Sequence, residues 1–234
     1  RIENTIGHTI TLQPDRIAFY SYAHVPWTSK SQRLYNEADL PAPEEKIRLY
    51  LKGKEMLTAG GYHDIGMDHF ALPHDELFIA KENGRLRRNF MGYTTQNSEL
   101  LLGLGVSAIS DLGNAFAQND KSLSRYYAAI NEDRLAVKRG FFLNEEDLAF
   151  RRYIRDIACQ GTAVFRPEHL SALEAFCFPA LEQMAKDGLV EYDRSELRLT
   201  TEGHYFIRNV CSAFDLYLQM DHSFSGKQTF SKAI

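Results

Sequence analysis

Extended and helical segments alternate along the first third of the chain. Residues 16–24 are rich in β-branched and aromatic side chains and lie between two prolines, so they are predicted to form one buried strand. Residues 43–59 begin with a proline, have a helical pattern and are followed by two glycines, and residues 62–67 form a second extended segment. A further helix is predicted to start at Asp75. This order of strand, helix and strand favours an α/β layer with parallel strands.

The middle of the chain contains shorter elements. Residues 84–110 are rich in glycine, which indicates closely packed turns and short strands. Residues 120–131 and 145–159 have helical patterns, and Asn144 is placed to cap the second of these helices, whose first turn is acidic. We therefore expect a domain boundary near residue 145.

The last third has the outline of a winged-helix module. An amphipathic helix over residues 167–186 is followed by two short strands, 189–192 and 197–200, which flank a polar turn. Thr201 is predicted to cap a final helix that runs to Leu218. Helix, β-hairpin and helix in this order are typical of that module.

Charge and cysteine content exclude several classes of protein. The 27 Lys and Arg residues against 31 Asp and Glu give a net charge of −4, which excludes a broadly basic nucleic-acid coat. No apolar run approaches the roughly 20 residues of a membrane-spanning helix, so a soluble, cytoplasmic protein is expected. Cys159, Cys177 and Cys211 are odd in number and widely spaced, which favours neither a disulfide framework nor a zinc motif. Because the chain starts at Arg1 without a signal segment, we expect it to be part of a longer protein.

Asp68 and His69 directly follow the second extended segment. In barrel-like α/β folds the carboxyl ends of strands carry the active site, and an Asp beside a His can orient the ring or share its protons. The structural alternative is that Asp68 caps the next turn and His69 bonds to the backbone. His24 has no second ligand at a recognisable interval and is interpreted as a structural histidine rather than a metal ligand.

A second candidate site combines cations with nearby glycines. Arg85, Arg87 and Arg88 lie close to Phe90, and guanidinium groups match carboxylates or phosphates in two-point contacts. The cluster suits a small molecule with several negative charges, and the structural alternative is a solvated run of charge at a helix end. The glycines of residues 103–110 either let backbones pack closely or allow a planar ligand to approach, but the segment lacks the other residues of a phosphate-binding loop.

Five passages together resemble one known family. They are FYSYAHVP at 19–26, GMDHFALP at 66–73, RNFMGYTT at 88–95, GLGVSAIS at 103–110 and AQN at 117–119. In this order and spacing they resemble oxygen-independent coproporphyrinogen III oxidases, which are radical S-adenosylmethionine (SAM) enzymes of haem biosynthesis. The likeness extends from about residue 14 to residue 234.

The resemblance implies a fold and a reaction. Residues 1–144 are expected to form the distal part of a partial (βα) radical SAM barrel with active-site loops, within an α/β fold class. Residues 145–234 are expected to form a mostly helical, winged-helix-like C-terminal domain. The implied reaction is the oxidative decarboxylation of two propionate side chains of coproporphyrinogen III to vinyl groups, which gives protoporphyrinogen IX without dioxygen.

The resemblance also implies cofactors and partners. Family members use SAM and a [4Fe-4S] cluster, held by three closely spaced cysteines, to abstract a hydrogen atom from the propionate, and an electron donor reduces the cluster. The cysteines of this chain do not have that spacing. Cluster ligands are therefore expected upstream of Arg1, and this chain alone is expected to be inactive. Neither a nucleic-acid partner nor a membrane span is expected.

Several residues match family positions with known roles. Ala23 and Ile109 match positions that contact a second SAM, and Phe90 and Met91 match a catalytic pair near the active site. The family pattern has Gln after the Phe, whereas Met91 lacks the amide for a side-chain hydrogen bond. The candidates for substrate binding are Asp68, His69, Arg85, Arg87 and Arg88.

Two other functions are compatible with parts of the sequence. A haem-handling radical SAM relative would bind or deliver haem without oxidising a porphyrinogen, although the passage at 66–73 argues against it. A winged-helix module could bind nucleic acid, but the final helix offers only Arg208 as a strong cation, which gives little attraction for phosphates.

Overall fold

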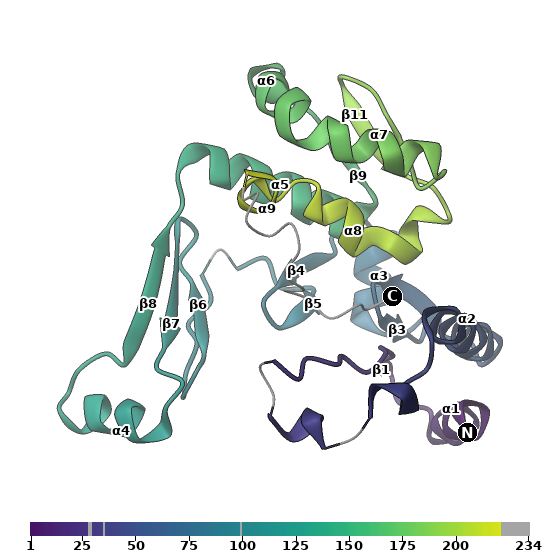
Figure 1. The fold of residues 1–234 in the computed structure, drawn as a ribbon, viewed down its shortest axis with the longest axis horizontal. Helices are drawn as coiled ribbons and strands as arrows, with labels where there is room; N and C mark the ends of the chain where they lie inside the picture. Colours follow the sequence, from purple (N-terminus) through teal and green to yellow (C-terminus); the bar gives the residue numbers. More distant parts are fainter. Residues whose placement is uncertain (28–29, 35, 99, 221–234) are drawn as a thin grey trace.

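The helices of the first third follow from local sequence signals. The structure, a computed structural model, describes residues 1–27, 30–34, 36–98 and 100–220. Helix α2 (Pro43–Ala59) begins with a proline, whose missing N–H has no partner in a first turn, and ends at Gly60, whose N–H donates to the Met56 carbonyl. Helix α3 (Glu76–Glu82) is capped by Asp75, which accepts from Leu77 N. Both predicted helices are confirmed. Helix α1 (Ile2–Leu12) packs against α2 (Figure 1).

The first sheet contains three short strands, and two 3-10 turns lie outside it. The strands are β1 (Arg16–Ala18), β2 (His63–Gly66) and β3 (His69–Ala71), in the order β1-β3-β2, and the 3-10 turns are η1 (Lys30–Arg33) and η2 (Glu37–Asp39). The prediction of one buried strand over residues 16–24 is wrong beyond Ala18. Among the described strands, β1 pairs with β3 alone, and β3 begins at His69, opposite Ala18. The chain after Ala18 therefore has no described strand to pair with. Tyr20 is accordingly exposed.

The prediction of parallel strands is wrong. All strand pairs between described residues are antiparallel. The reason is visible between β2 and β3, where Met67 and Asp68 form a tight turn with Met67 in the left-handed region at φ 50°. A tight turn can only join antiparallel neighbours, because parallel strands need a long crossover. The coarser expectation of a mixed α/β fold is confirmed.

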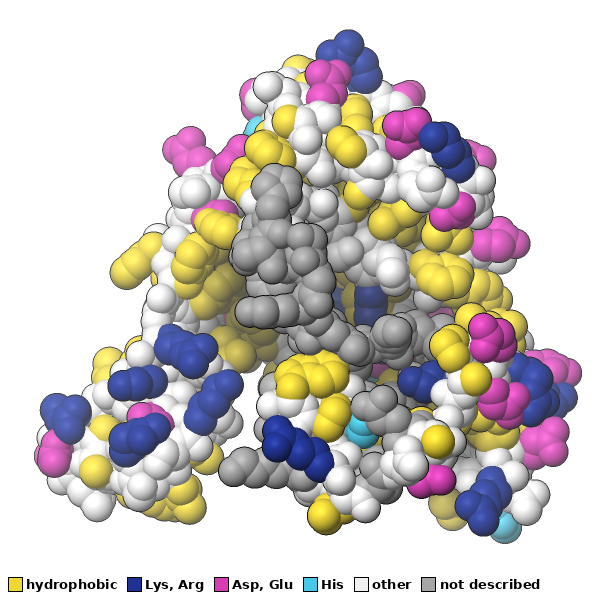
Figure 2. All heavy atoms as spheres, in the orientation of Figure 1, with side chains coloured by type: hydrophobic (Ala, Val, Ile, Leu, Met, Phe, Trp, Pro, Cys, Tyr) yellow, Lys and Arg dark blue, Asp and Glu magenta, His cyan; other side chains and the backbone are white. Residues whose placement is uncertain are grey.

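The glycine-rich middle forms short antiparallel strands, as predicted for residues 84–110. They are β4 (Arg87–Asn89), β5 (Gly92–Thr94) and β6 (Ile109–Asp111), which begins at the end of that range. Beyond it, β7 (Ala115–Asn119) and β8 (Val137–Phe142) follow, with helix α4 (Leu123–Asn131) between them. The β6-β7-β8 sheet projects from the rest of the molecule, at the left of Figure 1, and all six residues of β8 are exposed. Figure 2 shows Lys and Arg side chains gathered over the α4 end of this sheet.

Helix α5 (Glu145–Gln160) leads into the last third and confirms the predicted cap at Asn144. The Asn144 side chain accepts from Asp147 N, and the Asp147 carboxylate accepts from Asn144 N. The following elements are β9 (Thr162–Val164), η3 (Pro167–His169), α6 (Leu170–Ala172), η4 (Leu173–Cys177), α7 (Phe178–Lys186), β10 (Val190–Tyr192), β11 (Glu196–Leu199), η5 (Gly203–Phe206), α8 (Ile207–Ser212) and α9 (Leu216–Met220). The predicted hairpin is confirmed as β10 and β11, with β9 added to its open edge.

Two helices of the last third are less regular than the sequence predicts. The segment over residues 167–186 is helical throughout but contains a π turn, η4, which ends at Cys177. Pro179 follows in the first turn of α7, and its missing N–H cannot continue the hydrogen-bond ladder. The prediction of one helix from Thr201 to Leu218 is wrong. Thr200 rather than Thr201 caps its start, accepting from Gly203 N at 3.0 Å, and the chain bends before α9, where Asp215 accepts from Leu218 N.

The largest hydrophobic core lies in the last third. Phe150, Ile157, Leu181, Leu197 and Phe214 are among its buried members, so helices and sheet share one interior there. Two smaller clusters stabilise the first sheet against α2 and α3. Among the described helices, none combines the length and the apolar character needed to cross a membrane.

Candidate functional site

The β4–β5 hairpin presents Phe90 and Met91 at its tip. Asn89 pairs with Gly92, so the two residues between them form the turn, and the Asn89 side chain accepts from Met91 N at 2.8 Å. Gly92 has a φ of 122°, which favours glycine. The tip separates the two side chains: Phe90 lines one cavity and Met91 lines another.

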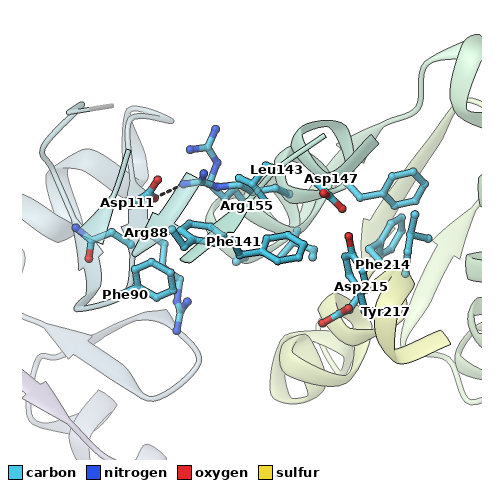
Figure 3. A pocket seen from close by; sticks show the side chains of 17 residues that line it. Arg88, Phe90, Asp111, Phe141, Leu143, Asp147, Arg155, Phe214, Asp215 and Tyr217 are labelled. Carbon is cyan, nitrogen blue, oxygen red and sulfur yellow. Dashed lines mark hydrogen bonds and ion pairs between the residues drawn. The ribbon is translucent and has the colours of Figure 1, made fainter. Parts of the chain in front are cut away.

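The cavity beside Phe90 has a volume of about 490 Å³, and we call it the aromatic cavity. Its aromatic lining comes from Phe90, Phe116, Phe141, Phe150, Phe214 and Tyr217. Phe90 and Phe116 meet edge to face with ring centroids 5.1 Å apart, and Phe141 and Tyr217 do the same at 5.7 Å. Figure 3 shows Phe90 toward one end of the cavity and Phe214 and Tyr217 toward the other, with Phe141 between them.

The cavity beside Met91 has a volume of about 980 Å³, and we call it the arginine cavity. Its cationic lining consists of Arg87, Arg88, Arg151, Arg152 and Arg155. Arg88, Arg151 and Arg155 line both cavities, so they form a common wall between the aromatic and the polar space.

Sequence reasoning found the β4 arginines but missed those of α5. Arg151 and Arg155 are one helical turn apart, so they project from the same face, and Arg152 lies beside them. That spacing was a visible signal. What it could not reveal is that α5 packs against β4, which brings Arg152 and Arg155 to the same cavity as Arg87 and Arg88.

Arg151 differs from the other arginines of the wall because it is held by a buried carboxylate. Its guanidinium donates to Asp111 and, at 2.9 Å, to the Gly113 carbonyl, and it lies 5.0 Å from the centroid of the Phe116 ring. Asp111 is only 7 % exposed. The pair therefore fixes the Phe116 ring against which Phe90 packs, and Arg151 acts as a structural part of the wall.

Burial shifts two titratable groups of the arginine cavity. It raises the pKa of the Asp156 carboxyl against the opposing charges of Arg155, Arg152 and Arg87. It also raises the pKa of the Cys159 thiol to about 11, although Arg88 and Arg87 oppose this shift. Both shifts favour the uncharged form, so the cavity retains its excess of positive charge.

A third cavity, of about 570 Å³, is lined by Ala23 and Asp68, and we call it the Asp68 cavity. Tyr50 and Tyr205 line it with edge-to-face rings 6.4 Å apart. Arg208 of α8 also lines it and donates to the Asp68 carboxylate at 2.7 Å.

His69 also faces the Asp68 carboxylate. Its Nδ1 lies 2.9 Å from Asp68 Oδ1, an ion-pair distance, and is buried without a regular hydrogen-bond partner among the described residues. Burial raises the pKa of Asp68, but His69 and Arg208 together outweigh it, so the net pKa is lower than usual.

The remaining predicted residues lie apart from these cavities. Arg85 is exposed and Ile109 is on β6, and among the described residues neither lines any of the three cavities. A Cβ at Gly103 would lie 2.6 Å from the Ile109 carbonyl oxygen, so this glycine serves close backbone packing. Ala23 and Ile109 are therefore not brought to one cavity.

The cysteines do not fit an iron–sulfur cluster. Burial raises the pKa of Cys177 and Cys211 to about 12, and all three thiols are free and buried. Metal ligation requires the thiolate, which these surroundings disfavour. Within the part of the chain that the structure describes, no three His, Cys, Asp or Glu side chains gather where they could hold a metal ion.

Comparisons with known proteins agree on one family, although no protein-family model matches the chain. The oxygen-independent coproporphyrinogen III oxidase of Escherichia coli is 40 % identical to it, with 98 % of this chain and 51 % of the relative covered. The enzyme of that name from Pseudomonas aeruginosa is 39 % identical, with 98 % and 50 % covered. The chain thus spans about half the length of these curated relatives.

A solved structure and a shorter relative extend the comparison. The structure of Escherichia coli coproporphyrinogen III oxidase, described as a radical SAM enzyme, superposes with a TM-score of 0.85 at 40 % identity, over 92 % of this chain and 51 % of that one. The oxygen-independent coproporphyrinogen III oxidase of Thermostichus vulcanus is 40 % identical, and the match covers 99 % of this chain and 72 % of the relative. With this identity over most of a relative's length, the chain belongs to the oxygen-independent coproporphyrinogen III oxidase family.

Proposed function

We propose that the protein containing this chain converts coproporphyrinogen III to protoporphyrinogen IX without dioxygen, as a cytoplasmic enzyme of haem biosynthesis. The observation that carries the proposal is the common wall of Arg88, Arg151 and Arg155 between the aromatic and the arginine cavity. A tetrapyrrole with several propionates needs an apolar space for its ring and cations for its carboxylates, and the two adjoining cavities supply both.

The residues of the two cavities then have distinct roles. Phe90 contacts the macrocycle, and Phe116 supports the Phe90 ring edge to face. Arg87 and Arg88 bind carboxylates. Met91 is 85 % exposed and contributes apolar surface where the family pattern has an amide. Arg85 remains a prediction from the sequence.

Asp68 lines the Asp68 cavity rather than the arginine cavity, and His69 lines neither of the two. We propose that the Asp68 cavity receives SAM, since Ala23 lines it together with the aromatic faces of Tyr50 and Tyr205 and the polar pair of Asp68 and Arg208. Aromatic faces suit an adenine ring, and charged groups suit the amino acid end. The contact of Ile109 with SAM remains a prediction.

The cofactors would supply the radical chemistry. SAM and a reduced [4Fe-4S] cluster, when bound, supply the radical that abstracts hydrogen from a propionate side chain. Because the three buried thiols do not fit the cluster, we place its ligands, and the docking of its electron donor, outside these 234 residues. What this chain contributes is binding and orientation of the substrate.

The finer fold assignment is also proposed. Residues 1–144 would complete the distal part of a partial radical SAM barrel, supported by the superposition with the Escherichia coli enzyme. Residues 145–234 would form a winged-helix-like domain, supported by the order of α5, β9, α7 and the β10–β11 hairpin. The fourteen residues 221–234 lie outside the described part of this region.

The test is anaerobic turnover by the full-length protein. Purified protein, SAM, a chemical reductant and coproporphyrinogen III should yield protoporphyrinogen IX, measured as protoporphyrin IX after oxidation and chromatography. Carbon dioxide should appear in a ratio of two per product molecule. Binding of haem or of coproporphyrin without any conversion would contradict the proposal and favour the haem-handling alternative.

The nucleic-acid alternative gains no support from the structure. Arg208, the strong cation of the final helical region, donates to the largely buried Asp68 carboxylate at 2.7 Å. A guanidinium held in this way is not available to a phosphate unless the Asp68 contact breaks.

A further inference from the structure

Four guanidinium groups of the arginine cavity have no carboxylate within ion-pair distance among the residues that the structure describes. They belong to Arg87, Arg88, Arg152 and Arg155. Arg151 is the exception in the same cavity, because Asp111 holds it. Elsewhere many arginines are paired, for example Arg16 with Asp75 and Arg125 with Asp120. Arg85 and Arg139 also lack such a partner among the described residues, but the arginine cavity brings four of these arginines to one space.

The described lining of the cavity is strongly positive. Its described lining has five arginines against two carboxylates, Asp111 and Asp156, which gives these residues a formal charge of +3. Its other side chains include the amides of Asn89, Gln96 and Asn97, which leave that charge unchanged. A concave surface with several unpaired guanidinium groups is a site for more than one carboxylate.

The four arginines without a carboxylate partner come from two elements that line the same cavity. Arg87 and Arg88 are consecutive on β4, and Arg152 and Arg155 lie on the face of α5 that lines the cavity. The Tyr93 hydroxyl ties the hairpin to α5 by donating to the Ala158 carbonyl at 2.7 Å. The two arginine pairs are thus held in a fixed relation before any ligand binds, which lowers the cost of binding.

We propose that the arginine cavity binds the propionate carboxylates that the reaction leaves unchanged, while the macrocycle lies in the aromatic cavity. This inference rests on the proposed function. Each converted side chain changes from –CH2–CH2–COO⁻ to –CH=CH2 with release of CO2. The proton and two electrons that it loses would pass to SAM, the oxidant, which would leave as methionine and 5′-deoxyadenosine. One C–H bond and the bond to the carboxylate carbon break, the second bond of the vinyl group forms, and the negative charge leaves the carboxylate as neutral CO2 forms.

The difference between binding in the ground state and in the transition state decides which carboxylates the arginines should hold. A guanidinium contact stabilises a carboxylate more than a transition state in which its charge is leaving, so it would raise the barrier for a reacting propionate. A retained propionate keeps its charge throughout, so the same contact stabilises substrate, transition state and product equally. The four guanidinium groups without a carboxylate partner are therefore best suited to the retained carboxylates.

The experiment compares two porphyrins that differ only in the reacting side chains. The full-length protein is titrated with coproporphyrin III and with protoporphyrin IX, followed by porphyrin fluorescence. The Arg152→Gln/Arg155→Gln double variant should bind both about tenfold or more weakly, since each carries the retained propionates. Arg198→Gln is the matched control, because Arg198 is an exposed arginine of β11 that lines none of the three cavities.

Two results would overturn the inference. A loss of affinity for coproporphyrin III alone would show that the arginines hold the reacting carboxylates. Unchanged affinity for both porphyrins would show that the α5 arginines hold neither. If the α5 double variant fails to fold by circular dichroism, Arg87→Gln/Arg88→Gln provides the same comparison from β4.

Kinetics separate this inference from the proposed function. If the wild-type protein is active, the Arg152→Gln/Arg155→Gln variant should have a KM about tenfold higher and a kcat within about threefold of the wild-type value. The reason is that the contact is the same in the ground state and the transition state. A double variant with Lys instead of Gln at position 155 should regain part of the affinity for both porphyrins. A wild-type protein that binds both porphyrins through these arginines but does not convert coproporphyrinogen III would refute the proposed function and not the cation contacts.

Discussion

Arg208 of α8 donates to Asp68 of the β2–β3 turn at 2.7 Å, across 140 positions of sequence. The contact joins the first sheet to the last helical region at the Asp68 cavity. Asp68 has a side chain that is only 15 % exposed, whereas Arg208 is half exposed. The pair therefore fixes how two distant parts of the chain enclose one cavity.

The Asp68 pair should make stability depend on acid pH. The pKa of Asp68 is lower in the folded protein than its ordinary value of 3.8, so its contribution is complete above that value and is lost as pH falls through the folded pKa. Asp68→Asn should reduce the free energy of unfolding by about 1 kcal/mol at neutral pH, because Arg208 is half exposed, and should make it less dependent on pH below about 5. Urea unfolding at several pH values measures both effects. An unchanged acid dependence would contradict the role of this pair.

Asp111→Asn should destabilise the protein more strongly. The substitution leaves the Arg151 guanidinium without its buried carboxylate, and breaking a buried pair costs about 2 to 4 kcal/mol. Glu196→Gln is the control, because its pair with Arg198 is exposed and should contribute less than about 1 kcal/mol. Urea unfolding measures the free energy of unfolding of both variants. Equal losses in the two variants would contradict the role given to burial of the Asp111 pair.

Two glycine substitutions should have opposite signs. Gly103→Ala would place a Cβ 2.6 Å from the Ile109 carbonyl oxygen and should destabilise by about 1 to 3 kcal/mol. Gly7 lies in α1, and apart from its chain neighbours and the backbone of its own helix, no described atom lies within 4 Å of the place that an added methyl group would take. Gly7→Ala should therefore stabilise by about 0.5 to 1 kcal/mol. Thermal melting compares the two variants, and a neutral Gly103→Ala would remove the close-packing explanation.

The three thiols should be inert in the folded protein. Burial raises the pKa of Cys159 to about 11 and of Cys177 and Cys211 to about 12, so the reactive thiolate is scarce near about pH 8. Alkylation with iodoacetamide followed by peptide mass spectrometry should label them only after denaturation. Rapid labelling of Cys177 in the native protein would be inconsistent with its complete burial.

Phe90→Ala should weaken porphyrin binding about tenfold by removing one ring from the aromatic cavity. Phe142→Ala is the control, since Phe142 is 83 % exposed and lines none of the three cavities. Fluorescence titration with coproporphyrin III measures both. Equal losses in the two variants would mean that exposed aromatic surface, rather than the cavity, binds the ring.

Local signals predicted the elements that depend on neighbouring residues. Asn144 and Asp75 cap helices as expected, because a cap is made within one turn. The extended segment at 16–24 failed because a strand requires a partner, and β3 is too short to pair with it. The final helix failed because its bend is set by packing, with Phe214 fully buried at the break.

The candidate site shows the same division. Arg87 and Arg88 could be selected from the sequence because cations and an aromatic residue stand side by side there. Arg152 and Arg155 could not, since a charged helix face is usually solvated and only the packing of α5 on β4 turns it toward a cavity. Met91 lines the arginine cavity and Phe90 the aromatic one, a separation that depends on the turn between β4 and β5.

The amino-acid order alone determines three features, because each resides in contiguous residues. They are the capped helix starts, the glycines that permit tight turns and the likeness to one family. Packing between distant segments set the rest: the antiparallel pairing, the meeting of Asp68 with Arg208 and, among the described residues, the collection of four unpaired arginines at one cavity. Those features depend on which segments bury their apolar faces together. The proximity of charged residues that this burial produces cannot be predicted from the residues next to them in the sequence.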